Sequence, residues 1–76
     1  MLRRGEWSRV LSEREFEVAL LVAEGYSNKQ IARELGVCEG TVKLHVSRIF
    51  RKVGAGGRYS LIKLAASSSV IAQSPD

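Results

Sequence analysis

The sequence contains few of the residues that build disulfides, metal sites and catalytic centres. It has one cysteine and one histidine among 76 residues, so an internal disulfide is impossible and four metal ligands cannot be gathered. No nucleophile has a base within helical reach, and we expect His45 to pack beside the core rather than to act as a ligand or base. The sequence therefore predicts a protein without enzymatic activity, bound metal or cofactor.

Long apolar runs are also missing. No segment is long and apolar enough to span a membrane, and no signal-peptide pattern follows Met1. A chain of this length forms one domain, close to the smallest size at which a hydrophobic core alone is sufficient for stability. We therefore expect a soluble cytoplasmic protein that does not bind membranes.

Positive charge is concentrated in the middle of the chain. Residues 1–24 have a net charge of −1, whereas residues 25–63 carry eight Lys or Arg against Glu34 and Glu39, a net charge of +6. Such clustering indicates a polyanionic partner. Ordinary solubilising charge is the alternative explanation of this feature taken alone.

Two capping boxes, each formed by a serine and an acid or amide three residues later, predict the starts of two helices: Ser12 with Glu15, and Ser27 with Gln30. We predict helices at about 13–24 and 28–35, and expect Gly25 and Gly36 to end them. The acids in the first turn of the first helix are expected to stabilise it through the helix dipole.

The stretch that follows predicts a central helix at 39–53 with two unlike faces. At about 100° per residue, four aliphatic residues fall on one inward stripe: Val42, Val46, Ile49 and Val53. The outward face has no acid and carries small, aliphatic and basic residues: Gly40, Lys43, Leu44, Ser47, Arg48 and Arg51. Cations contact phosphates while small and aliphatic side chains contact base edges, so this face is typical of a helix that reads DNA.

The residues at the start of the central helix are unfavourable for helix formation. Cys38 occupies the N-cap position, where a thiol caps weakly, and a redox role for it is the less favoured alternative. Gly40 costs about 1 kcal/mol relative to alanine, which we interpret as room for a close backbone approach to DNA. A short helix, a glycine turn and a longer basic helix indicate a helix-turn-helix, although an all-α packing hairpin without DNA function shares the spacing.

A fourth helix is expected at about 58–67. Its apolar residues cover an arc of roughly 200°, about twice what one core-facing stripe requires. The surplus apolar surface favours a homodimer interface. The alternative is that the lead-in or the tail covers this surface. Arg58 opposes the dipole in the first turn, which indicates a phosphate contact. We expect an all-α four-helix bundle with a central helix-turn-helix, spanning residues 11–67 between a flexible lead-in (1–10) and a tail (68–76).

The chain resembles the LuxR-type (also called GerE-type) DNA-binding domain over about Leu11 to Ala66. The resemblance lies in LSEREFEVALLVAEGYSNKQIARELGV, in GTVKLHVSRIFRKVG and in Arg58. It implies a four-helix fold, base contacts by Lys43, Leu44 and Ser47, and phosphate contacts by five further residues: Asn28, Lys29, Thr41, Lys52 and Arg58. Arg48 and Arg51 on the same basic face are expected to add phosphate contacts.

The resemblance also implies dimerisation through the last helix, for which we select Leu61, Leu64 and Ala65. The chain departs from the family pattern at Cys38, where Ser or Thr is usual, and at Gly56-Gly57 and Ser47, where more polar residues are common. Family members usually carry an upstream receiver or ligand-sensing domain. The chain is therefore expected to be either a short stand-alone regulator or the C-terminal piece of a longer one.

These observations predict a cytoplasmic regulator of bacterial transcription that binds specific double-stranded DNA as a dimer. The recognition helix 39–53 is expected to enter the major groove. The alternative is a protein-interaction module that contacts RNA polymerase or a partner regulator through helix 58–67.

Overall fold

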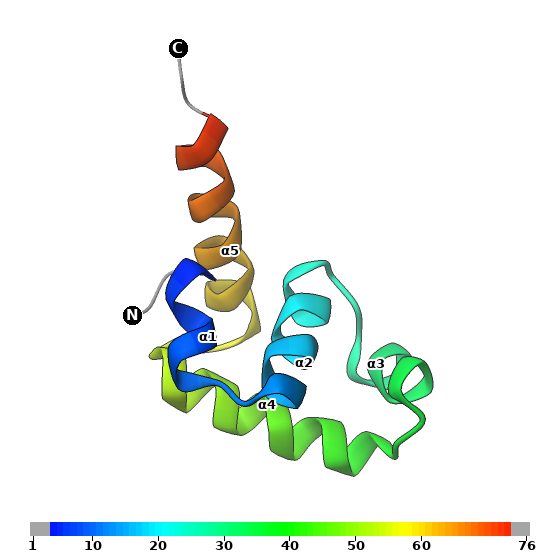
Figure 1. Ribbon diagram of the computed structural model, residues 1–76. Helices are drawn as coiled ribbons and strands as arrows, with labels where there is room; N and C mark the ends of the chain where they lie inside the picture. The colour runs from blue at the N-terminus through cyan, green and yellow to red at the C-terminus, as the bar shows by residue number, and fades with distance from the viewer. Residues whose placement is uncertain (1–3, 74–76) are drawn as a thin grey trace.

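A computed structural model of the protein describes residues 4–73, with side chains described for residues 4–66. Within that range all the regular secondary structure is helical, in six segments: η1 (Arg4–Glu6), α1 (Trp7–Val10), α2 (Glu13–Ala23), α3 (Asn28–Leu35), α4 (Glu39–Val53) and α5 (Arg58–Gln73). Figure 1 shows α4 along one side of the molecule, with α3 near its start and α1 and α5 near its end. The predicted all-α fold is confirmed.

The observed helices follow the predicted ones closely in the middle of the chain. Helices α3 and α4 have the predicted bounds, and α2 ends one residue earlier than predicted, at Ala23. Helix α5 is longer than predicted, because it continues past residue 67 to Gln73. Residues 1–3 and 74–76 of the predicted lead-in and tail lie outside the described residues.

Residues 4–10 differ from the expected flexible lead-in. They form a 3₁₀ turn and the single turn of α1, and the side chain of Trp7 is fully buried. A segment of this length is too short to show a hydrophobic period, which is why the sequence pattern did not reveal it. One buried tryptophan ties the segment to the domain.

Both predicted capping boxes are present. Ser12 Oγ accepts from the Glu15 N–H at 3.1 Å, and Glu15 Oε1 accepts from the Ser12 N–H at 2.9 Å. Ser27 and Gln30 repeat the arrangement at 3.1 and 2.8 Å. The turn between α3 and α4 depends on Gly36, whose φ of 70° lies in the left-handed region that favours glycine.

The core lies where α2, α4 and α5 meet around Trp7. Helix α2 packs on both α4 and α5, while α3 packs mainly on α4. The predicted inward stripe of α4 is confirmed, since all four residues are buried: Val42, Val46, Ile49 and Val53. Burial of each such side chain stabilises the fold by about 1.5–3 kcal/mol, so α4 is held by one face and its other face is left to solvent.

Candidate nucleic-acid interface

The outer face of α4 is exposed along its length. Lys43, Ser47, Arg48 and Arg51 are all exposed, and Leu44 retains 51% of its accessible surface. A leucine this exposed loses little water on folding, so it contributes little to the stability of the isolated domain. A large aliphatic side chain at the centre of a basic face is instead suited to contact with another molecule.

The cations of this face have no acidic neighbours that neutralise them. Among the described residues, Lys43, Arg48 and Arg51 form no ion pair. Glu39 is the one acid in α4, in its first turn, where the helix dipole favours a negative charge. The face therefore presents three uncompensated positive charges to solvent, which attract a polyanion.

The first turn of α4 is built around Cys38 and Thr41. The Cys38 side chain does not cap the helix, but its Sγ lies 3.2 Å from Thr41 Oγ1, close enough for a hydrogen bond. That side-chain contact, together with nearby backbone N–H groups, lowers the pKa of the exposed thiol. Thr41, a predicted phosphate contact, is half-buried with its hydroxyl beside the thiol.

Lys52 has a partner that the sequence analysis did not foresee. Its Nζ lies 2.8 Å from Glu15 Oε1, and Glu15 is only 4% exposed. The Lys52 ammonium, followed by the Ser12 N–H, holds the pKa of the Glu15 carboxyl below its ordinary value of 4.5. The Lys52 ammonium therefore neutralises a buried carboxylate and joins α4 to the start of α2, and the predicted phosphate contact of Lys52 stays a prediction.

Arg58 also has hydrogen-bond partners inside the domain. Its Nη1 donates to Asn28 Oδ1 at 2.9 Å, and its Nη2 donates to the Tyr26 carbonyl at 2.6 Å. The cation in the first turn of α5 thus has one acceptor in the α2–α3 turn and one at the first residue of α3, and its predicted phosphate contact stays a prediction. Asn28 is half-buried beside it, while Lys29 is exposed at the next position.

The predicted dimer residues on α5 lie partly inside the domain. Leu61 is fully buried and Ala65 is 7% exposed, because both face α2 across the core. Leu61 therefore has no exposed surface with which to contact a second copy, and Ala65 has little. Leu64 is half-buried, and Tyr59 is 72% exposed with Lys63 Nζ 5.4 Å from its ring centroid. Nothing in the sequence pattern singles out Tyr59.

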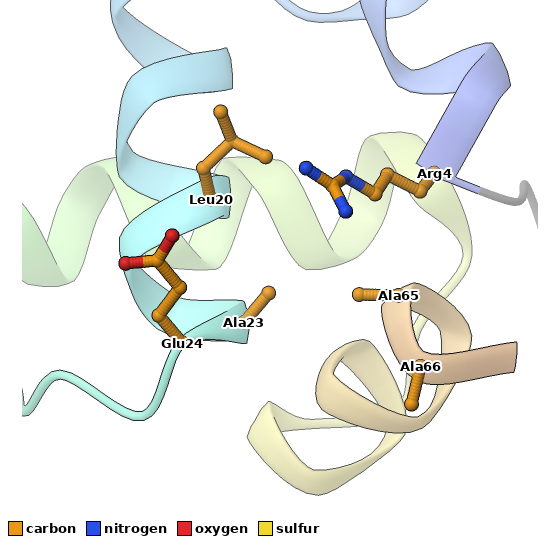
Figure 2. A pocket seen from close by; sticks show the side chains of 6 residues that line it. All are labelled: Arg4, Leu20, Ala23, Glu24, Ala65 and Ala66. Carbon is orange, nitrogen blue, oxygen red and sulfur yellow. The ribbon is translucent and has the colours of Figure 1, made fainter. Parts of the chain in front are cut away.

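A shallow hollow lies between η1, α2 and α5, away from the outer face of α4. Figure 2 shows its lining: Arg4, Leu20, Ala23, Glu24, Ala65 and Ala66. Its volume of about 170 Å³ is smaller than that of typical small-molecule sites, about 300–1,000 Å³. We assign no ligand to it.

The remaining candidate groups do not form a second site. No cluster of three or more His, Cys, Asp or Glu that could hold a metal ion occurs within residues 4–73. The ring of His45 is half-buried on α4, and its Nδ1 is buried without a hydrogen-bond partner in the described part of the chain. None of the helices in that part is long and apolar enough to cross a bilayer.

Comparison with known proteins agrees with this geometry. Residues 9–65 match the family of bacterial regulatory proteins called the luxR family. The response regulator protein VraR of Staphylococcus aureus and that of Staphylococcus epidermidis are each 39% identical to the chain over 71 residues. The aligned region covers 93% of this chain and 34% of each relative, so the chain spans about a third of the length of these curated relatives. Since the family match includes the whole of α2, α3 and α4, the chain belongs to the luxR family of bacterial regulatory proteins.

Proposed function

We propose that this chain is a sequence-specific DNA-binding domain that regulates transcription, with α4 as its recognition helix in the major groove. The observation that carries the proposal is the outer face of α4, which combines three exposed cations with the half-exposed Leu44. Membership of a family of bacterial regulatory proteins supports the same conclusion. The major groove admits an α-helix and displays a distinct pattern for each base pair.

Three side chains of α4 are assigned to base edges. Lys43 donates to acceptors on guanine, Leu44 packs against a thymine methyl group, and Ser47 donates to or accepts from a base. All three lie on one exposed face of a helix whose opposite face is buried. The buried stripe fixes the rotation of the helix about its axis, so these side chains are presented together.

Phosphate contacts surround the base contacts. Arg48 and Arg51 lie on the same helix, while Lys29 is exposed at the start of α3. Asn28 and Thr41 complete the set as neutral donors beside these cations. Contacts to phosphate set the register of the protein on the duplex without reading sequence. Lys52 and Arg58 are left out, because their charged groups have partners inside the domain.

Two copies are proposed to bind adjacent half-sites, about one helical turn or ten base pairs apart. The surface left for a second copy on α5 includes Leu64, which is half-buried. A half-buried leucine can bury its remaining surface without opening the core. We propose Leu64 as the centre of this contact.

The test is selection of duplexes from a random pool, followed by fluorescence anisotropy across a salt series. The wild-type chain is expected to select a preferred sequence and to bind it with a steep salt dependence. Lys29→Ala should weaken all sequences alike and lower the salt slope by about one, whereas Leu44→Ala should change the preferred sequence. Uniform loss in both variants would argue against base reading by α4.

Arg14→Ala is the matched control for the loss of a cation. Arg14 is exposed on α2, lies 3.5 Å from Glu17, and is not among the residues of the proposed interface. Its removal should change neither the salt slope nor the preferred sequence. A loss of affinity equal to that of Lys29→Ala would mean that net charge, and not the position of the charge, controls binding.

The exposed Tyr59 favours a second candidate function, contact with RNA polymerase or a partner regulator through α5. A tyrosine that is 72% exposed offers a large rigid contact surface of the kind enriched at interfaces. In a reconstituted transcription assay, Tyr59→Ser would then abolish regulation while DNA binding persists. Loss of regulation only in step with loss of DNA binding would reject this candidate.

A further inference from the structure

The guanidinium of Arg58 joins two segments that are about thirty residues apart along the chain. It starts α5, while its acceptors are Asn28 Oδ1 at 2.9 Å and the Tyr26 carbonyl at 2.6 Å, on either side of the α3 N-cap. Arg58 and Asn28 are both half-buried. Two bonds from one rigid, planar group fix the position of the acceptor side chain more tightly than one bond from a lysine would.

These contacts determine which way the Asn28 amide faces. A guanidinium can only donate, so the amide must turn its oxygen toward Arg58. The amide nitrogen branches from the same carbon and is therefore directed away from Arg58, with two N–H donors. No acceptor within the described residues takes them. Asn28 also occupies the first position of α3, beside the exposed Lys29.

We propose that Arg58 is a positioning residue for DNA: it holds the Asn28 amide so that its Nδ2 donates to a backbone phosphate. This inference rests on the proposed function, in which Asn28 contacts the duplex. In this proposal Arg58 acts through Asn28 and not through its own contact with DNA, since two of its five N–H donors are already directed at acceptors inside the domain. Without Arg58 the amide is free to rotate, and the donor must be ordered at the moment of binding.

The experiment measures affinity for the selected duplex by anisotropy across a salt series, using Arg58→Lys, Asn28→Ala and the double variant. Arg58→Lys keeps the positive charge but cannot span both acceptors. Each single variant is expected to weaken binding by roughly five- to tenfold, the effect of one hydrogen bond, with the salt slope unchanged. The double variant should be no weaker than either single one, because both remove the same contact.

Asn28→Asp separates the DNA contact from the stability of the fold. The aspartate still accepts from Arg58, so the melting temperature should stay at or above that of the wild type. It has no amide donors and repels phosphate, so affinity should fall at least as far as in Asn28→Ala. A second readout is the side-chain NH₂ signal of Asn28 in ¹⁵N-edited spectra. It should shift on addition of DNA in the wild type and not in folded Arg58→Lys.

The outcomes separate this inference from the proposed function. If the wild type selects no duplex, the proposed function fails. If the wild type binds but Arg58→Lys binds equally well, Arg58 acts by charge alone and the positioning role is overturned. Additive losses in the double variant, or wild-type affinity in Asn28→Asp, would also overturn it.

Discussion

Among single residues, Glu15 links the start of α2 to α4. It completes the capping box of α2 with Ser12 and also pairs with Lys52 from α4. Its pKa is lowered chiefly by the Lys52 ammonium. A lowered pKa in the folded state means that Glu15 stabilises the fold above its ordinary pKa of 4.5, and that this contribution is lost as the pH falls through the lowered value.

Replacing Lys52 by Met should therefore destabilise the domain in a pH-dependent way. At neutral pH we expect a loss of about 1–2 kcal/mol, because a nearly buried carboxylate loses its charged partner. The difference from wild type should shrink as Glu15 becomes protonated in acid. Urea unfolding at a series of pH values measures this difference, with Arg14→Met as control.

The Arg14–Glu17 pair is 3.5 Å apart and its side chains are 48% and 58% exposed, so its loss should have little effect on stability. Equal effects of the two substitutions would contradict the argument.

The thiol of Cys38 leaves the N-cap of α4 without a side-chain acceptor. Serine at this position can accept from the backbone N–H groups of the first turn, as Ser12 and Ser27 already do in α2 and α3. We expect Cys38→Ser to raise the free energy of unfolding by about 0.5–1 kcal/mol. The measurement is the urea midpoint, with Cys38→Ala for comparison. An equal gain in Cys38→Ala would show that capping is not the cause.

At the level of whole elements, the glycine that ends α3 and the glycine in the first turn of α4 have opposite roles. Gly36 adopts a φ of 70°, whereas Gly40 has helical backbone geometry, and a Cβ added at either would meet no atom within 4 Å. The two positions therefore differ in backbone conformation and not in available space. Gly36 is required by the turn, while Gly40 weakens the helix that follows it.

Alanine at these two positions should shift stability in opposite directions. Gly40→Ala is expected to stabilise the domain by about 0.5–1 kcal/mol, and Gly36→Ala to destabilise it by about 1 kcal/mol or more. Thermal unfolding followed by circular dichroism measures both. If Gly40 is present for a close approach to DNA, Gly40→Ala should also bind DNA more weakly despite its greater stability. Unchanged affinity would assign Gly40 no role at the interface.

For the molecule as a whole, the short N-terminal segment belongs to the core. Trp7 is among the largest fully buried side chains, and α1 contacts both α2 and α4. A domain of this size has little stability to spare, because only a modest core opposes the entropy of the chain. The tryptophan therefore accounts for a substantial share of the packing that holds α4 in place.

Trp7→Ala is expected to cost about 3–5 kcal/mol, enough to leave much of the population unfolded at room temperature. Val10→Ala in the same turn is the control, since Val10 is 39% exposed and its truncation should cost about 0.5 kcal/mol or less. Circular dichroism and near-ultraviolet spectra compare the two variants. A folded Trp7→Ala domain with a melting temperature close to that of the wild type would show that α1 is dispensable.

Residue spacing alone predicted α2, α3 and α4, the two serine caps and the two faces of α4, but neither the single turn of α1 nor the full length of α5. Each of these features depends on residues three or four positions apart, such as Ser12 with Glu15 and Ser27 with Gln30, so local spacing is sufficient to predict them. The outward set of Lys43, Leu44 and Ser47 followed from the same spacing, and the family resemblance was confirmed.

The contacts of several charged and apolar residues, in contrast, follow from how the helices pack against one another. Lys52 pairs with Glu15 across 37 positions, and Arg58 reaches Asn28 and Tyr26 across 30 and 32 positions. Leu61 is buried against distant helices although its apolar arc alone suggested a free surface. Such contacts depend on the angles at which whole helices pack, and periodicity within one helix carries no information about those angles. The sequence shows where a cation stands along a helix. The packing of the helices decides whether that cation has an acceptor inside the domain, as Lys52 and Arg58 do, or faces solvent.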